Sequence, residues 1–363
     1  MIVDRNSCAV TSSCGPASVP VQRTVTRDVL TIEGERLHDV SLAGWMYGRE
    51  LGTAPVVVIV GGITASPFPI GDPSAPPESG RDAWWPALFG EGGIDISRCT
   101  VLCPCWPANG TTWRGLEQST SLPRMSVLGL ADLIAAWLDG IECHTVSSFI
   151  GASLGGMVGV AFAIRHAPGC RKVVSISGGL RPDGWGTATR YIQRELVRDG
   201  IRHGDIATAM RRARQLAMIT YRGRDELNQR FGALTPELDC PPIAEYLEQH
   251  GRRFAERFPV NTFLLLSEAI DRGWIAHDSA GLRRALEQIT AEVIVVGVPT
   301  DLLFPWTLQT ELHQELQNAG VKTSLWSLAS IYGHDAFLAD QERLREVLCT
   351  AGAYRLDGET QHD

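Results

Sequence analysis

The chain has 363 residues, of which 44% are hydrophobic and 20% charged, proportions that are ordinary for a soluble globular protein with one large α/β domain and room for an inserted cap. A formal net charge of −8 argues against nucleic acid or an anionic membrane surface as the main partner. No apolar stretch reaches the roughly 18–20 residues that a membrane-spanning helix requires, so we expect no membrane partner.

The N-terminus and the cysteines bear on the cellular compartment. Residues 1–25 lack the basic start and continuous apolar core of a signal peptide, and they predict a poorly ordered polar arm. The nine cysteines are odd in number and scattered, which favours reduced thiols. We therefore expect a cytoplasmic location. No cluster of histidines has metal-ligand spacing, so we predict no metal and no bound cofactor.

From residue 26 onward, short β-rich apolar runs alternate with longer amphipathic segments, which is typical of an α/β fold with a buried, mostly parallel central sheet. Helical spacing predicts a helix over 126–141, and small residues predict another directly after residue 153. The predicted strands, in chain order, are 38–48 (an edge strand), 55–60, 99–106, 146–151, 171–178, 291–298 and 322–330.

Strand signals stop for about a hundred residues in the middle of the chain, and only helical patterns remain there. A helical insertion between two core strands predicts a cap over the carboxyl edge of the sheet, where open α/β sheets bind ligands. The predicted organisation is an N-terminal arm (1–25), the first part of the core (26–180), a helical cap or lid (181–282), the second part of the core (283–352) and a flexible C-terminal tail (353–363).

A single serine stands between two glycines where the strand ending at 151 becomes a helix. Gly-x-Ser-x-Gly in this context is typical of the nucleophile turn of the α/β-hydrolase fold, and we predict that fold. Gly151 and Gly155 leave room for a strained serine backbone, and the helix N-terminus favours negative charge near the hydroxyl. Ser153 is therefore the candidate nucleophile.

A serine hydroxyl needs a base held by a carboxylate, and in this fold the chain order is serine, acid, histidine. Asp301 follows the buried strand 291–298, and His334 follows the last strand. Taken alone, each could be an ordinary turn or loop residue, but together with Ser153 they predict a catalytic triad. Backbone N–H groups of Ile63 and Leu154 are the candidate oxyanion hole.

Several stretches between about residues 84 and 338 resemble the homoserine O-acyltransferases of the α/β-hydrolase superfamily, the acetyl- and succinyltransferases of methionine biosynthesis. The cap segments ITYRGRDELNQRF and RFPVNTFLLLSEAID carry this resemblance most specifically, because ordinary esterases do not share them. The resemblance implies a ping-pong reaction with acyl-CoA as co-substrate and L-homoserine as acceptor. It also implies small-molecule substrates as the main partners, with a homodimer joined through cap helices.

The resemblance further implies that Arg214, with Tyr221, binds the α-carboxylate of the amino acid and that Asp335 binds its ammonium group. From the residues alone, Arg214 could equally lie on a solvated helix face, Tyr221 could be a core residue, and Asp335 could cap a loop. An arginine is nonetheless the side chain best suited to a carboxylate, because its planar guanidinium donates two parallel hydrogen bonds.

The loop 103–125 departs from the family pattern of the acetyltransferases, and this loop is expected to border the acyl pocket. We therefore favour succinyl-CoA over acetyl-CoA, with Arg114 and Arg124 either pairing with the succinyl carboxylate or lying on the surface. The acceptor could also be serine or a specialised amino acid. Two alternatives to an acyltransferase are a carboxylesterase of the same fold and a binding protein without catalytic activity.

Overall fold

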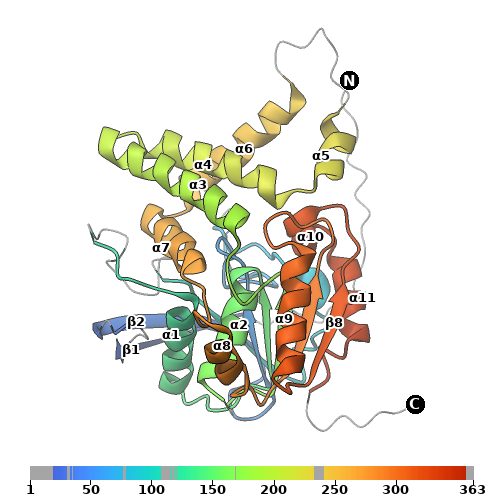
Figure 1. Ribbon diagram of the computed structural model, residues 1–363. Helices are drawn as coiled ribbons and strands as arrows, with labels where there is room; N and C mark the ends of the chain where they lie inside the picture. Colours follow the sequence, from blue (N-terminus) through green and yellow to red (C-terminus); the bar gives the residue numbers. More distant parts are fainter. Residues whose placement is uncertain are drawn as a thin grey trace.

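The computed structural model describes residues 19–356 apart from 31–32, 35, 77–78, 108–115, 117–118, 120, 168 and 233–240. Most of the expected N-terminal arm, Arg114, and the last part of the expected C-terminal tail therefore lie outside the described residues. Figure 1 shows a twisted central sheet between helical layers, with a group of helices standing above one end of it.

In the described residues, eight strands form one sheet in the order β1-β2-β4-β3-β5-β6-β7-β8. β1 pairs with β2 and β2 with β4 in antiparallel fashion, and all other pairs are parallel. This mostly parallel sheet with helices on both faces confirms the predicted α/β class. The strands are β1 Val21–Leu30, β2 Arg36–Gly48, β3 Val56–Val60, β4 Thr100–Pro104, β5 Ser148–Ala152, β6 Lys172–Ile176, β7 Glu292–Gly297 and β8 Thr323–Ser327.

The first two strands correct the expectation that residues 38–48 form the edge of the sheet. Those residues belong to β2, which is paired on both sides, and β1 is the edge. β1 begins at Val21, inside the segment expected to be a poorly ordered arm. Its polar side chains are mostly exposed, and Val29 is its one buried residue, so it lacks the apolar pattern of a core strand.

Helices cover both faces of the sheet (Figure 1). One face packs against α1, α2 and α9 through residues such as Leu130, Val158 and Leu312. The other packs against η1, α10 and α11 through residues such as Leu88 and Leu344. The elements are η1 Pro86–Leu88, α1 Val127–Gly140, α2 Leu154–Arg165, α9 Trp306–Asn318, α10 Ala336–Ala339 and α11 Gln341–Thr350.

The helices between β6 and β7 form the cap. They are α3 Gly184–His203, α4 Ile206–Tyr221, α5 Arg224–Phe231, α6 Pro242–Arg257 and α7 Val260–Asp271. α4 packs against α3 and α6, while α7 contacts both α3 and the core helix α1. α7 therefore links the cap to the core. In Figure 1 the layer formed by α3, α4 and α6 stands above the carboxyl end of the sheet.

Two boundaries of the predicted domains differ from the structure. The expected cap ends at 282, but α8 (Ser279–Leu286) begins before that and packs against α9 of the core, because Leu286 is part of the main hydrophobic core. The expected tail begins at Ala353, which is completely buried. Lys172 Nζ donates hydrogen bonds to the carbonyls of Gly352 and Arg355, and these bonds hold the chain against the core up to that point.

Within the described part of the chain, no helix combines the length and apolar character that crossing a bilayer requires.

Candidate active site

Ser153 lies in a strained turn between β5 and α2. Its φ of 56° and ψ of −119° are unusual for a residue other than glycine. A Cβ atom on Gly151 would lie 2.0 Å from the carbonyl oxygen of Gly155, and one on Gly155 would lie 2.0 Å from that of Val60. The two glycines are therefore required by backbone contacts on either side of the serine.

The three predicted triad residues lie in one hydrogen-bonded chain. Ser153 Oγ lies 2.8 Å from His334 Nε2, and His334 Nδ1 lies 2.7 Å from Asp301 Oδ2. Because the carboxylate can only accept, the proton is assigned to Nδ1, which leaves Nε2 to accept from the serine hydroxyl. The side chains of His334 and Asp301 are almost completely buried, at 4% and 0% exposure.

The surroundings of the triad hold its orientation. Asp301 Oδ1 accepts hydrogen bonds from the backbone N–H groups of Leu303 and Phe304, both at 2.8 Å. The His334 ring stacks on Phe304 and meets Phe337 edge-on, with both ring centroids 5.4 Å away. These contacts fix the imidazole between a hydrogen-bonded carboxylate and two apolar rings, which is the arrangement that serves acyl transfer.

The two candidate oxyanion-hole groups flank the serine. Leu154 is the first residue of α2, so its N–H has no carbonyl partner within the helix. Ile63 lies in the loop after β3, where a Cβ atom on Gly62 would be 3.8 Å from Ser153 Oγ. Trp106 Nε1 donates to the Gly62 carbonyl at 3.0 Å and so fixes this loop. The arrangement is suited to stabilising an oxyanion on a carbonyl carbon attached to Ser153.

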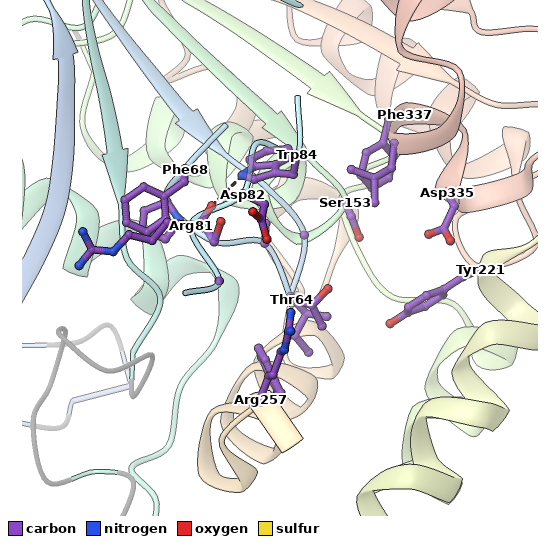
Figure 2. Close-up of a pocket in the computed structure, with 18 of the residues that line it drawn as sticks. Thr64, Phe68, Arg81, Asp82, Trp84, Ser153, Tyr221, Arg257, Asp335 and Phe337 are labelled. Carbon is purple, nitrogen blue, oxygen red and sulfur yellow. Dashed lines mark hydrogen bonds between the residues drawn. The ribbon is translucent and has the colours of Figure 1, made fainter. Parts of the chain in front are cut away.

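A cavity of about 840 Å³ opens from Ser153 at the carboxyl edge of the sheet. The three residues predicted to bind the amino acid, Arg214, Tyr221 and Asp335, line it together with Ser153 and His334. Figure 2 shows Tyr221 and Asp335 on one side of Ser153, opposite the loop residues that follow β3. The structure thus brings all of these predicted residues to one site.

Each of these three side chains is placed by its neighbours. The Arg214 guanidinium lies over the Tyr221 ring at 5.1 Å, and it makes no ion pair with any described residue. Burial raises the pKa of the Asp335 carboxyl, although Arg214 and His334 oppose this. Arg222 Nη1 lies 3.8 Å from Asp335 Oδ2, whereas Nε and Nη2 of the same guanidinium donate closer hydrogen bonds to Glu226. A cation is therefore attracted to Asp335, and an anion to Arg214.

The two residues considered for the acyl carboxylate do not reach the described site. Arg114 lies outside the described residues, and Arg124 is exposed and lines neither the main cavity nor the smaller pocket behind Ser153. That smaller pocket is largely closed. It lies between the cap and the core and is lined by Ile63, Ser153, Arg190, Gln193, Tyr221, Phe263, Ser267, Ile270, Leu303 and Phe304.

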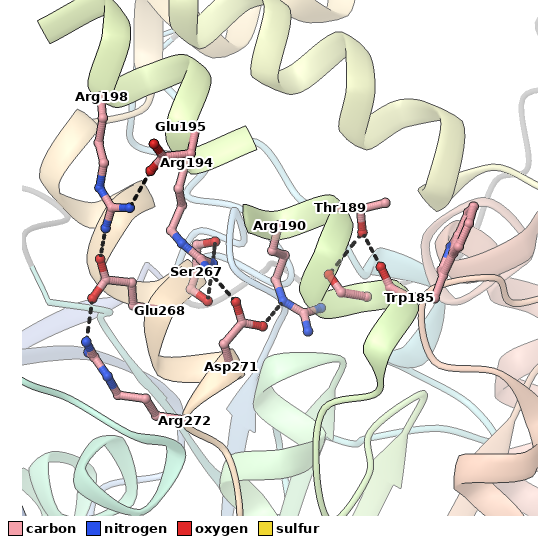
Figure 3. A network of polar contacts seen from close by, with 11 residues as sticks. Trp185, Thr189, Arg190, Arg194, Glu195, Arg198, Ser267, Glu268, Asp271 and Arg272 are labelled. Carbon is pink, nitrogen blue, oxygen red and sulfur yellow. Dashed lines mark hydrogen bonds and ion pairs between the residues drawn. The ribbon is translucent and has the colours of Figure 1, made fainter. Parts of the chain in front are cut away.

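Arg190 is the functional candidate that sequence reasoning missed. Figure 3 shows it in a network with Arg194 and Asp271 at the interface of α3 and α7. Arg190 Nε donates to Asp271 Oδ1 at 2.6 Å, and Arg194 Nη2 lies 2.6 Å from Asp271 Oδ2. Each arginine is only 6% exposed. The spacing of Arg190, Arg194 and Arg198 at i, i+4 and i+8 was the available signal, because it places all three on one helix face.

The charges of this network do not balance. Two buried guanidinium groups share one carboxylate, and Arg190 Nη2 is buried without a hydrogen-bond partner among the described residues. A buried donor left without a hydrogen-bond partner is unfavourable by about 1–3 kcal/mol, and by more when the group is charged. The unpartnered Nη2 favours an anionic group near Arg190, and the pocket that Arg190 lines beside Ser153 encloses about 20 Å³, the space of about one water molecule.

Among the described residues, no group of three histidine, cysteine, aspartate or glutamate side chains is placed to hold a metal ion.

No protein-family model matches the chain. The serine O-succinyltransferase of Litchfieldella anticariensis is 34% identical over 305 residues, which are 73% of this chain and 80% of that protein. The homoserine O-succinyltransferase of Xanthomonas campestris pv. campestris is 33% identical over 312 residues, 85% of this chain and 77% of that protein. A crystal structure of the homoserine O-acetyltransferase from Bacillus anthracis matches with a TM-score of 0.83 over 94% of this chain and 100% of that chain. At 16% identity, that match concerns the fold.

We predict that Gly155→Ala reduces acyl transfer by about a hundredfold or more, because the added Cβ must displace either Val60 or the turn that carries Ser153. Acylation of Ser153 by an activated ester measures the effect, and circular dichroism checks the fold. Gly184→Ala is the matched control, because a Cβ there meets nothing within 4 Å. Full activity in Gly155→Ala would contradict the role assigned to this contact.

Proposed function

This chain belongs to the homoserine and serine O-acyltransferase family of the α/β-hydrolase fold, and we propose from that premise that it transfers a succinyl group from succinyl-CoA to the side-chain hydroxyl of a small hydroxy amino acid. The enzyme is an acyltransferase, as its relatives are. The observation that carries the choice of donor is the buried, unpartnered Nη2 of Arg190, a residue that lines the pocket beside Ser153.

In the first half of the proposed reaction, His334 accepts the proton of the Ser153 hydroxyl while Oγ attacks the thioester carbonyl carbon. The N–H groups of Ile63 and Leu154 stabilise the oxyanion that forms. The carbon–sulfur bond then breaks, and His334 gives its proton to the leaving sulfur. The products of this half are free CoA and an acyl ester on Ser153.

In the second half, the hydroxyl of the amino acid takes the place of the CoA thiol. His334 accepts its proton as the oxygen attacks the acyl carbon, and then returns the proton to Ser153 Oγ as the ester bond to the enzyme breaks. Asp301 orients the imidazole in both halves and stabilises its charged form. The buried hydrogen bond of 2.7 Å between the two side chains supports that role.

The acceptor is held by its two charged groups. Arg214 is suited to the α-carboxylate, because its guanidinium lines the cavity and has no ion-pair partner among the described residues. Tyr221 supports that guanidinium with its ring, and Asp335, next to His334, is suited to the ammonium group. These contacts would bring the side-chain hydroxyl to the acyl ester.

The donor is selected by charge. The succinyl group ends in a carboxylate, whereas the acetyl group is neutral. A carboxylate beside Arg190 would balance the second guanidinium of the Arg190–Asp271–Arg194 network, and in a buried site this attraction is stronger than in water. An acetyl group would leave the buried charge uncompensated.

Two acceptors remain in the proposal. L-homoserine is the acceptor implied by the family resemblance and by the name of the Xanthomonas relative, and its product would serve methionine biosynthesis. L-serine is the second candidate, because the relative from Litchfieldella is named a serine O-succinyltransferase.

Exposed apolar side chains on the cap helices support a homodimer as the working assembly. Tyr191 and Ile192 on α3, and Ile206 and Ile219 on α4, are large apolar side chains that remain exposed in the single chain. Exposed apolar surface of this kind marks interaction sites. Light scattering on the purified full chain would report the mass of one or two copies.

The proposed function is tested by CoA release from succinyl-CoA or acetyl-CoA, each with L-homoserine, with L-serine and without an acceptor. We expect release to depend on the acceptor and to be faster with succinyl-CoA. Ser153→Ala should abolish it and leave the fold intact. Equal release with and without an acceptor would show a hydrolase instead.

We predict that Arg190→Gln lowers kcat/KM for succinyl-CoA by about ten- to a hundredfold, the loss expected for a charged hydrogen bond of about 1.5–3 kcal/mol. The same variant should use acetyl-CoA as well as the unchanged enzyme does. Arg202→Gln on the same helix is the matched control, because Arg202 is 58% exposed and pairs with Asp199. Equal losses with both donors would argue that Arg190 only supports the cap.

We predict that Asp335→Asn raises KM for the amino acid by about ten- to a hundredfold, since a neutral amide cannot replace a carboxylate beside an ammonium group. CoA release in the first half-reaction should change little. In the unchanged enzyme, burial raises the pKa of Asp335, so KM for the amino acid should rise as pH falls through that raised pKa. The pH dependence should be absent from the Asn variant, and its persistence would contradict the assignment.

A further inference from the structure

One face of α6 carries three basic side chains, two of which line the active-site cavity. His250, Arg253 and Arg257 follow one another at i, i+3 and i+7, which places them on the same side of the helix. His250 and Arg257 line the cavity that contains Ser153. Burial, together with the charges of Arg214 and Arg253, lowers the pKa of His250 to about 4. The cap side of the cavity is thus strongly electropositive.

The two arginines of this row differ from many other arginines of the cap. Arg222 is held by Glu226, and Arg252, next to Arg253 in the chain, pairs with Glu248. Arg253 and Arg257 are exposed, and neither forms an ion pair or a hydrogen bond with the described residues. In a chain with a net charge of −8, these two unpaired cations, of which Arg257 lines the cavity and Arg253 lies one helical turn before it, favour an anionic ligand.

Arg257 lies away from the groups assigned to the amino acid. In Figure 2 its side chain extends from α6 toward Thr64, while Tyr221 and Asp335 lie on the other side of the view. Beyond Thr64 the cavity wall includes the aromatic side chains of Trp84 and Phe68, with Arg81 and Asp82 beside them. An uncharged, flexible chain could lie along this wall, with its thioester at Ser153 and an anionic end outside.

We propose that Arg253 and Arg257 bind the phosphate groups of the CoA nucleotide, so that α6 distinguishes CoA thioesters from thioesters without phosphate. This rests on the proposed function, since it names the part of the donor that the same cavity recognises. Arginines suit phosphate because their guanidinium groups donate several hydrogen bonds at once. Exposed cations also steer an anionic substrate to the site, and salt weakens that effect.

The experiment compares succinyl-CoA with succinyl-pantetheine, which has the same acyl group and thiol arm but no phosphate. We expect the double variant Arg253→Gln/Arg257→Gln to lose at least tenfold in kcat/KM for succinyl-CoA, mainly through KM. Its kcat/KM for succinyl-pantetheine should not change. Added salt should lower kcat/KM of the unchanged enzyme for succinyl-CoA, and this dependence should be weaker in the double variant.

Arg252→Gln is the matched control, because it removes the same charge from the same helix at a residue that pairs with Glu248 and does not line the cavity. The Arg252→Gln variant should keep the kcat/KM of the unchanged enzyme for both succinyl-CoA and succinyl-pantetheine. Arg257→Lys should restore part of the loss seen in Arg257→Gln, since it returns the charge without the planar fork.

Three outcomes would overturn the inference. Equal losses with both thioesters would show that the arginines act on the acyl group or on the cap itself. A higher KM of the double variant for the amino acid would show that Arg253 and Arg257 bind the acceptor instead of CoA. An unchanged kcat/KM of the double variant for both thioesters would show that the two arginines do not bind the donor. Transfer from succinyl-pantetheine to the amino acid by the unchanged enzyme tests the proposed function separately, because it requires no phosphate contact.

Discussion

The site depends on the close approach of backbone segments around Ser153. Val60 at the end of β3 comes so near to Gly155 that no side-chain carbon fits between them, and the turn is forced into the positive φ that presents the hydroxyl. A second close backbone contact involves the loop that precedes His334. A Cβ on Gly223, between α4 and α5, would be 1.9 Å from the carbonyl oxygen of Ile331. The cap is thereby positioned directly against the loop that carries His334.

This contact explains how chemistry and recognition are divided between the two parts of the chain. The core supplies the nucleophile, the base and the oxyanion donors on strand ends, where the sheet holds them rigidly. The cap supplies the cations, including Arg190 and Arg214, on helices that face the same serine. Because the small pocket is largely enclosed between the cap and the core, a charge there acts in a medium of low polarity and discriminates strongly between charged and neutral ligands.

The sequence allowed the triad to be predicted because Asp301 and His334 each follow a recognisable buried strand in the order that the fold requires. The edge strand β1 and the role of Arg190 could not be predicted from such local patterns. β1 is a mostly polar strand at the sheet edge, so its strand character depends on pairing with β2. Arg190 lies in a helix rich in charged residues and looks solvated in sequence. Its burial against Asp271, 81 residues later, is a tertiary contact that local patterns do not contain.

The same triad can serve hydrolysis or transfer, and the difference must come from how the second nucleophile is held. Water is abundant and always competes for an acyl ester. A hydroxyl positioned against a reacting carbon, however, gains an effective concentration of about 10⁵ M or more, far above that of water. In this protein the groups suited to supply that positioning are Arg214 and Asp335, which line the cavity together with Tyr221. Their contribution is therefore to the rate of transfer as well as to recognition, since without them the acyl ester would meet water first.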